Sequence, residues 1–384
     1  MLRRRARRLA RLALDLALYP MIRVRPRSVV FSNFGGGGFG CNPKYLTEEI
    51  LRRDLGWDVV WLVGPTVDRT GFPPGVRLVD ANSLRALCEL RAARAWVVNT
   101  LAEPWSTRKS PGQFYLQTGH GSFGIKRIGL DAHDTSPRRR RMISRQAVKL
   151  DLFTSHSAFE TRVHADGFGY GGRIRELGHA RNDPFFGPRE SIADDVRSAL
   201  GVGAEQRIAL HVPSFRADGA ADALELDYPA LQGALSRRFG GDWVSVVRYH
   251  PRSRAAGMTA PPGVIDASAY PDIQELLVAA DVAVSDYSSC LFDFLLTGRP
   301  GFVHAPDAED FAVRQGLYFP LSEAPFPVAL SAGELVAAIE GFDADGYADR
   351  IAAFLDRQGS VEDGQASRRI VDLLEGVVGE GGDG

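Results

Sequence analysis

The sequence predicts an α/β protein built from two doubly wound units, and three observations carry this prediction. The chain has 384 residues, more than one hydrophobic core usually supports, so two domains are expected. Its composition, 45% hydrophobic and 24% charged, is typical of globular proteins. Short β-branched runs alternate with helical patterns, which indicates parallel sheets whose strands are connected by helices. These runs cover residues 29–32, 59–63, 95–100, 114–117 and 152–155, and then 208–212, 244–248, 282–285 and 301–304.

A polar stretch with proline and glycine, around residues 181–190, separates the two series of strands. We therefore predict one unit over residues 28–187 and a second over residues 188–384. A ligand is expected between them, because open α/β sheets bind ligands beyond the carboxyl ends of their strands.

The first 27 residues carry nine arginines against one acid, Asp15. Leu9, Leu12 and Leu16 have helical spacing, with most arginines off that stripe. This pattern predicts a basic amphipathic helix that lies on an anionic membrane surface. A helix packed on the protein body is the alternative. A secretion signal is disfavoured because charged residues interrupt the apolar run.

Composition excludes several other classes. A formal net charge of −1 gives no indication of a nucleic-acid partner. Cys41, Cys88 and Cys290 are far apart and lack C-x-x-C spacing, so neither a disulfide framework nor a zinc site is expected. No stretch approaches eighteen uninterrupted apolar residues, as a membrane-spanning helix would need.

A glycine-rich loop follows the first predicted strand. Gly35, Gly37 and Gly40 satisfy the G-x-G-x-x-G spacing of dinucleotide sites. However, the strand at 59–63 ends in Gly64 without the acidic residue that would bind a ribose hydroxyl. We therefore expect no nicotinamide or flavin cofactor, and interpret the loop as one that lets an acceptor approach the backbone.

His120 lies between Gly119 and Gly121 directly after the strand at 114–117. An imidazole with an ordinary pKa of about 6.5 can accept a hydroxyl proton at physiological pH, so His120 is a candidate general base. A purely structural histidine is the alternative. Further along, Lys126 and the arginines at 138–141 form either a solvated basic face or a surface for phosphates.

In the second unit, cations follow two apolar strands. Ser214 and Arg216 come after the strand at 208–212, and Arg248 and His250 end the next one. Cations that are accompanied by hydrogen-bond donors suit an anionic ligand.

The segment from Asp286 to Asp293 runs from a strand through a turn into a helix. Ser288 and Ser289 would cap that helix, so hydroxyl groups, backbone N–H groups and the helix dipole would converge on a diphosphate. Ordinary helix capping is the alternative interpretation of these serines.

Together these segments resemble the CDP-glycerol glycerophosphotransferase family, the primases and polymerases of teichoic acid synthesis. The family pattern Gln-Thr-Trp-His-Gly-Thr corresponds to Gln117–Ser122, and Pro-Arg-Asn-Asp to Ala180–Asp183. Pro-Thr-x-Arg corresponds to Pro213–Arg216, while Arg-x-His-Pro stands intact at Arg248–Pro251. Asp-Tyr-Ser-Ser-x-x-Phe-Asp stands in full at Asp286–Asp293. Gly119, Ser122 and Ala180 depart from these patterns, so the acceptor side could be remodelled.

The resemblance implies a GT-B-like fold of two Rossmann-like domains, with an acceptor side at 28–187 and a CDP-donor side at 188–384. It implies transfer of glycerol phosphate, or a related polyol phosphate, from CDP-glycerol to a hydroxyl of a lipid-linked or polymeric acceptor. CMP would be released, without cofactor or metal, at the cytoplasmic face of the membrane. The implied catalytic residues are His120 and His250. The implied donor-binding residues are Ser214, Arg216, Arg248, Asp286, Ser288, Ser289 and Asp293.

Two other functions remain open from the sequence alone. A GT-B glycosyltransferase that uses a nucleotide sugar would employ a similar cleft and helix-end diphosphate site. A non-catalytic membrane-bound protein that retains the fold is the third possibility.

Overall fold

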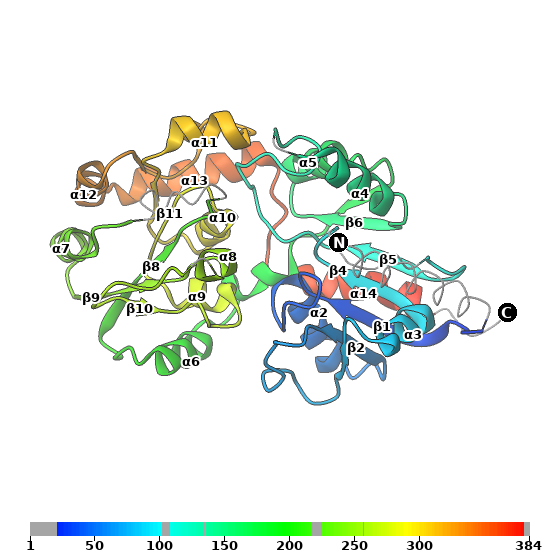
Figure 1. The fold of residues 1–384 in the computed structure, drawn as a ribbon. Coiled ribbons are helices and arrows are strands. Elements are labelled where there is room, and N and C mark those ends of the chain that lie inside the picture. The colour runs from blue at the N-terminus through cyan, green and yellow to red at the C-terminus, as the bar shows by residue number, and fades with distance from the viewer. Residues whose placement is uncertain (1–20, 102–107, 134, 217–224, 256, 380–384) are drawn as a thin grey trace.

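A computed structural model describes residues 21–101, 108–133, 135–216, 225–255 and 257–379 of the chain. Two lobes lie side by side, and each is built around one parallel sheet with helices on its faces (Figure 1). The two doubly wound units expected from the sequence are confirmed.

The N-terminal lobe contains a seven-stranded sheet of order β3-β2-β1-β4-β5-β6-β7. All neighbouring pairs are parallel, and Val30 of β1 lies opposite Val60 and Trp96. Apart from the edge strands, these strands contain nearly continuous apolar runs because helices cover both faces. Their bounds are β1 Arg25–Ser32, β2 Asp58–Val63, β3 Arg77–Asp80, β4 Ala93–Val98, β5 Phe114–Gln117, β6 Leu152–Ser155 and β7 Arg173–Glu176.

The C-terminal lobe contains a six-stranded parallel sheet of order β10-β9-β8-β11-β12-β13. Leu210, Val246, Val284 and Phe302 from its four inner strands are buried in one core. The bounds are β8 Gln206–Val212, β9 Asp242–Val247, β10 Ile265–Asp266, β11 Val282–Ser285, β12 Gly301–His304 and β13 Val328–Ala329.

Helices connect the strands in both lobes. In the first part of the chain they are α2 Cys41–Arg52, α3 Leu84–Ala92, α4 Pro137–Ala147, α5 Ala158–Phe168 and the 3-10 helix η1 Ala180–Phe185. The C-terminal lobe adds α6 Glu190–Leu200, α7 Tyr228–Phe239, α8 Pro251–Ala255, α9 Ile273–Ala279, α10 Ser289–Phe294, η3 Leu295–Thr297, α11 Ala308–Gln315, η4 Leu321–Glu323, α12 Ala332–Glu340 and α13 Ala344–Gln358. The last helix is α14, Ala366–Val378.

All nine strands predicted from the sequence are present, and four others were missed. The missed strands, β3, β7, β10 and β13, are the outer strands of the two sheets. Each is only two to four residues long, and β7 has the polar sequence Arg-Ile-Arg-Glu. Short and half-exposed edge strands lack the apolar run by which the inner strands were recognised.

The final helix does not pack in the unit to which the predicted division at residue 188 assigns it. Although α14 follows the C-terminal lobe in sequence, Ile370, Val371 and Leu374 pack in the core of the N-terminal sheet. The Asp183 carboxylate of η1 accepts hydrogen bonds from the backbone N–H groups of Ala366 at 2.9 Å and Ser367 at 2.7 Å. A carboxylate at this end also suits the helix dipole.

The polar stretch that separates the two series of strands begins with a buried turn. Ala180, Arg181, Asn182 and Phe185 of η1 are all buried. The chain therefore crosses between the lobes through a packed and hydrogen-bonded turn.

The basic segment predicted at residues 1–27 lies mostly outside the described residues. Its end belongs to the sheet, because β1 begins at Arg25. The Arg25 guanidinium lies 2.6 Å from Glu89 and 3.3 Å from Asp58. Within the described part of the chain, no helix has the length and apolar character needed to cross a bilayer.

Replacing Asp183 by alanine should destabilise the protein by about 1–3 kcal/mol, because the first turn of α14 loses two hydrogen bonds to a charged group. Chemical denaturation measures the change. The exposed Asp195→Ala variant on α6 is the matched control and should stay within about 0.5 kcal/mol of wild type. Equal stability of the two variants would contradict the role assigned to Asp183.

Candidate functional site between the two lobes

His120 stands in a loop at the carboxyl end of β5, and a neighbouring carbonyl fixes its tautomer. Its Nδ1 lies 2.6 Å from the backbone oxygen of Asn99, which follows β4. A carbonyl oxygen can only accept, so Nδ1 carries the proton and Nε2 of the neutral ring is left as an acceptor. The Phe34 ring meets the imidazole edge-on at a centroid distance of 5.1 Å.

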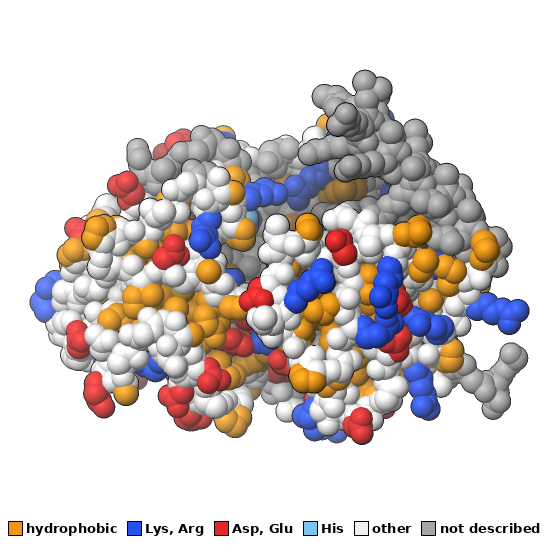
Figure 2. Space-filling view, turned by 60° about the horizontal axis from the view of Figure 1, so that its bottom comes forward, with side chains coloured by type: hydrophobic (Ala, Val, Ile, Leu, Met, Phe, Trp, Pro, Cys, Tyr) orange, Lys and Arg blue, Asp and Glu red, His pale blue; other side chains and the backbone are white. Residues whose placement is uncertain are grey.

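The surroundings of His120 favour its neutral form. His120 is exposed to solvent. Figure 2 shows a hollow in the surface between the two lobes. The protein around the ring displaces water and so lowers the pKa of His120, and the positive charge of Arg181 lowers it further. Neutral imidazole therefore predominates at physiological pH.

Two glycines allow the His120 loop to approach the other lobe. Gly119 has a φ of 64°, in the left-handed region that other residues rarely adopt. A Cβ atom at Gly121 would lie 3.2 Å from the Ser289 hydroxyl oxygen at the start of α10. The loop thus lies directly against the helix that was predicted to bind the diphosphate.

Backbone strain gathers around the same loop. Five described non-glycine residues have positive φ, and Phe34, Cys41 and Phe123 are three of them. Phe34 touches His120, and Cys41 lies 4.0 Å from Arg181. Strained conformations of this kind persist where the surrounding structure imposes them, which is common at functional sites.

Arg181 of η1 connects the His120 loop to the C-terminal lobe. Its guanidinium donates to the backbone oxygen of His120 at 2.7 Å and forms a close ion pair with Asp293 of α10. Both side chains are buried. Asp293, predicted to bind the donor, is therefore engaged by Arg181 and acts on the site through it.

Arg216 is also engaged within the protein. Its guanidinium lies 2.8 Å from Asp286 and 2.7 Å from Asp307. It also lies 5.1 Å and 5.0 Å from the ring centroids of Tyr287 and Phe311, which stack on each other. Only 4% of Arg216 is exposed. The structure thus brings Arg216, Asp286 and Ser214 together as predicted, but it does not present Arg216 as a free cation.

Lys126 supplies a cation that the sequence did not assign to the donor. Its ammonium group donates to the Ser214 hydroxyl at 3.2 Å, across the boundary between the lobes. Among the described residues, no carboxylate lies within ion-pair distance of it. Burial lowers the pKa of Lys126, while the nearby Asp286 raises it.

His250 has the opposite tautomer to His120. Its Nδ1 accepts the backbone N–H of Arg252 at 3.1 Å, so the proton of the neutral ring is on Nε2. The imidazole lies 5.7 Å from the Phe215 ring, next to Ser214. Burial, Arg252 and Lys126 lower the pKa of His250, in that order of importance. Arg248 is turned toward the backbone oxygen of Tyr270 at 3.1 Å.

Of the two serines predicted to cap the helix, one does so. Ser288 is the N-cap of α10, and its hydroxyl accepts the Cys290 N–H at 3.3 Å. Ser289 begins the helix and faces Gly121. Ser214, Arg216 and Asp286 form one connected group, and Arg181 joins His120 to Asp293. No direct contact joins His120 to His250 in the described structure.

Sequence reasoning missed Asn99 and Asp307 for identifiable reasons. The strand predicted at 95–100 ends two residues later than β4, which placed Asn99 inside the strand rather than after it. Asp307 follows β12 by three residues, and this position beyond the carboxyl end of a strand is the signal that could have found it.

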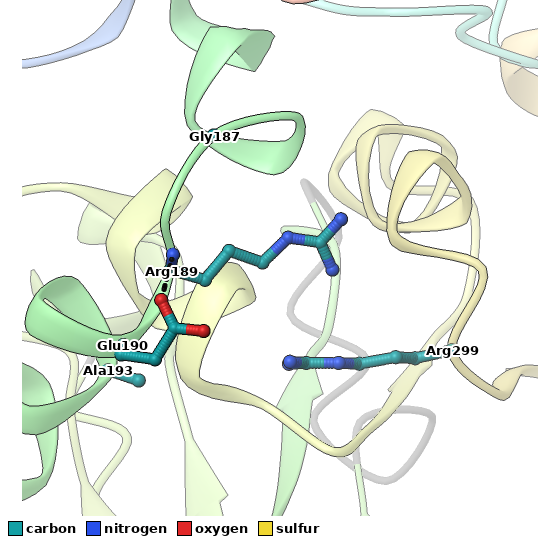
Figure 3. A pocket seen from close by; sticks show the side chains of 5 residues that line it. All are labelled: Gly187, Arg189, Glu190, Ala193 and Arg299. Atoms are coloured by element: carbon teal, nitrogen blue, oxygen red, sulfur yellow. Dashed lines mark hydrogen bonds between the residues drawn. The ribbon is translucent and has the colours of Figure 1, made fainter.

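A separate pocket of about 390 Å³ lies beside the crossing between the lobes and contains none of the predicted residues (Figure 3). Arg189, Glu190 and Arg299 line it, together with Gly187 and Ala193. It is open to solvent and lacks the hydroxyl and imidazole groups found at the His120 loop. In the described ranges, no group of His, Cys, Asp or Glu side chains is arranged to hold a metal ion.

Replacing Arg181 by methionine should destabilise the protein by about 3–5 kcal/mol, because Asp293 remains buried without its partner. The double variant Arg181→Met, Asp293→Leu should recover much of that loss. Denaturant unfolding of both variants tests this. A double variant no more stable than the single one would show that the ion pair is not the dominant contribution of Arg181.

Comparisons with known proteins agree with this geometry. The chain is 28% identical over 378 residues to the teichoic acid poly(glycerol phosphate) polymerase of Staphylococcus epidermidis, covering 93% of this chain and 52% of the relative. It is 27% identical over 365 residues to the teichoic acid glycerol-phosphate transferase of Staphylococcus aureus, covering 90% and 92%. The chain thus spans about half the length of the polymerase and nearly all of the transferase.

The fold of the chain is also similar to that of solved structures. The wall teichoic acid polymerase TagF superposes with a TM-score of 0.84 at 26% identity, covering 99% of this chain and 95% of that chain. The family model of CDP-glycerol:poly(glycerophosphate) glycerophosphotransferase matches residues 16–376. The chain therefore belongs to the CDP-glycerol:poly(glycerophosphate) glycerophosphotransferase family.

Proposed function

We propose that this protein transfers glycerol phosphate, or a related polyol phosphate, from CDP-glycerol to a hydroxyl group of an acceptor and releases CMP. The observation that carries the proposal is the pair of opposite histidine tautomers, with an acceptor nitrogen on His120 and a donor nitrogen on His250. Family membership supports the donor class. A variant of the similar polymerase TagF has been solved after soaking with CDPG.

In this mechanism the acceptor hydroxyl attacks the phosphorus that carries the polyol. A new phosphorus–oxygen bond forms, the bond to the bridging oxygen of the diphosphate breaks, and CMP leaves. Nε2 of His120 takes the hydroxyl proton as the bond forms. A neutral ring is required for this step, and the lowered pKa of His120 keeps it neutral.

The negative charge that develops on the leaving phosphate needs donors held in place beforehand. The proposed donors are Nε2–H of His250, the ammonium of Lys126 and the hydroxyls of Ser288 and Ser289. Arg216 acts indirectly in this proposal, because it orients Asp286, which in turn accepts the backbone N–H of Ser214 at 3.0 Å. A water-poor site between the lobes would strengthen each of these interactions.

The acceptor is proposed to be a lipid-linked or polymeric chain that ends in a hydroxyl group. Such an acceptor would be reached at the cytoplasmic face of the membrane, where the arginine-rich segment 1–27 would contact anionic lipids. Arg25 is already paired within the lobe, so the arginines at positions 3–11 are the ones expected to make this contact.

His120→Ala should lower the rate of CMP release from CDP-glycerol by about 10²- to 10⁴-fold in the presence of acceptor, because the general base is lost. Binding of CDP-glycerol, measured by calorimetry, should change little. The control is His133→Ala, an exposed histidine outside the His120 loop. Unchanged turnover by His120→Ala would refute the role of His120, and release of UDP from UDP-sugars without release of CMP from CDP-glycerol would refute the donor.

Deletion of residues 1–20 should reduce sedimentation with anionic liposomes, since the basic segment that attracts the lipid headgroups is removed. Raising the salt concentration should weaken binding of the full chain in the same direction, because salt screens these charges. The full chain with neutral liposomes is the control. A truncated protein that still sediments with anionic liposomes would contradict this role.

A further inference from the structure

A buried group of five ionisable side chains, which the proposed mechanism does not use, lies beneath the His120 loop. We call it the histidine cluster; it consists of Glu160, Glu362, His156, His164 and His179. The Glu160 carboxylate lies 3.0 Å from His179, 3.4 Å from His164 and 3.6 Å from His156. The side chains of His156 and His179 have no exposed surface.

Each imidazole of the cluster supports a different residue of the His120 loop. His156 Nε2 accepts the backbone N–H of Phe123 at 3.1 Å. Nδ1 of His179 lies 3.4 Å from the Ser122 hydroxyl. The His164 ring packs under Gly119, where a Cβ atom would come within 3.5 Å of it. The three contacts therefore flank His120 on both sides.

The contact at Phe123 holds a strained conformation. Phe123 has a φ of 40°, in the left-handed region that non-glycine residues rarely adopt. Its N–H is bound by His156, and its ring meets the His156 ring edge-on at 4.1 Å. Without His156, the backbone three residues after His120 would be free to relax.

Burial and neighbouring groups shift the pKa values of the cluster side chains in different directions. Burial raises the pKa of Glu160, but the three histidines outweigh burial and hold it well below its usual value. Burial lowers the pKa of His179, but Glu160, 3.0 Å away, outweighs burial and raises it. His156 is neutral, as its role as an acceptor requires, because burial lowers its pKa to about 3.

The cluster also reaches the crossing between the lobes. The Glu362 carboxylate accepts the backbone N–H of His179 at 3.1 Å and the Asn182 amide at 2.9 Å. The Asn182 oxygen in turn accepts from Gln274 of α9, in the C-terminal lobe, at 2.9 Å. Buried ionisable side chains are costly to desolvate, and apolar side chains of similar volume would fill the same space at a lower cost in free energy. Space filling alone therefore does not account for the cluster.

We propose that Glu160 and His156 are positioning residues for the reaction, acting through the His120 loop to hold the His120 imidazole in line with the acceptor hydroxyl. This inference rests on the proposed function, because it assigns a role to residues that do not touch the substrate. It predicts that kcat depends on the cluster while the KM for CDP-glycerol does not.

The test compares two substitutions of one residue. His156→Leu removes the acceptor for the Phe123 N–H, whereas His156→Gln supplies a side-chain oxygen that can take its place. We expect His156→Leu to lower kcat roughly 10- to 100-fold with KM within about twofold of wild type, and His156→Gln to restore most of the rate. Glu160→Gln should resemble His156→Leu. Glu176→Gln, which changes an exposed carboxylate that binds Thr161, is the control and should behave as wild type.

Hydrogen exchange of the backbone around residues 119–123 gives a readout that does not depend on activity. Exchange should be faster in His156→Leu and Glu160→Gln than in His156→Gln, with thermal unfolding confirming that each variant is folded. Wild-type kcat and loop protection in both His156→Leu and Glu160→Gln would overturn the inference. If wild type itself released no CMP from CDP-glycerol, the proposed function would fail, whereas the exchange measurement would still decide whether the cluster holds the loop.

Discussion

The buried ion pair between Arg181 and Asp293 is the interaction on which the arrangement of the site depends. Arg181 comes from the turn that crosses between the lobes, and Asp293 comes from the helix that starts at the predicted diphosphate site. The same guanidinium holds the backbone oxygen of His120. Both side chains are buried, so removing either one would leave the other as an unpaired charge inside the protein. One pair thus sets the distance between the proposed base and the proposed anion site.

Near this pair, backbone groups rather than side-chain carboxylates set the tautomers of His120 and His250. A carbonyl oxygen at Asn99 leaves His120 as an acceptor, and an N–H at Arg252 leaves His250 as a donor. Carboxylates are used instead to hold cations in place, as Asp286 and Asp307 hold Arg216. Arg216 is therefore paired within the protein, whereas Lys126 and His250 are the groups proposed to bind an anion.

Much of the fold could be predicted because inner strands bury both faces. Runs such as Val59–Val63 and Val282–Val284 are apolar throughout, so their place in a parallel sheet is visible from composition and spacing. The outer strands were missed because they bury little surface and need no such run. The return of α14 to the N-terminal lobe was missed because an apolar stripe does not specify which core it fills.

For the site, the sequence by itself determined which chemical groups stand at the carboxyl ends of the strands, including His120, His250 and the serines that cap α10. It could do so because strand ends and helix starts are local features. Only the tertiary structure decided which of these groups remain free. The pairing of Arg216 and Asp293, the tautomers of the two histidines and the cluster under the His120 loop all arise from contacts between residues distant in the chain. Hydrogen bonds and ion pairs of that kind depend on how the lobes pack, and the pattern of residues within one segment does not determine that packing.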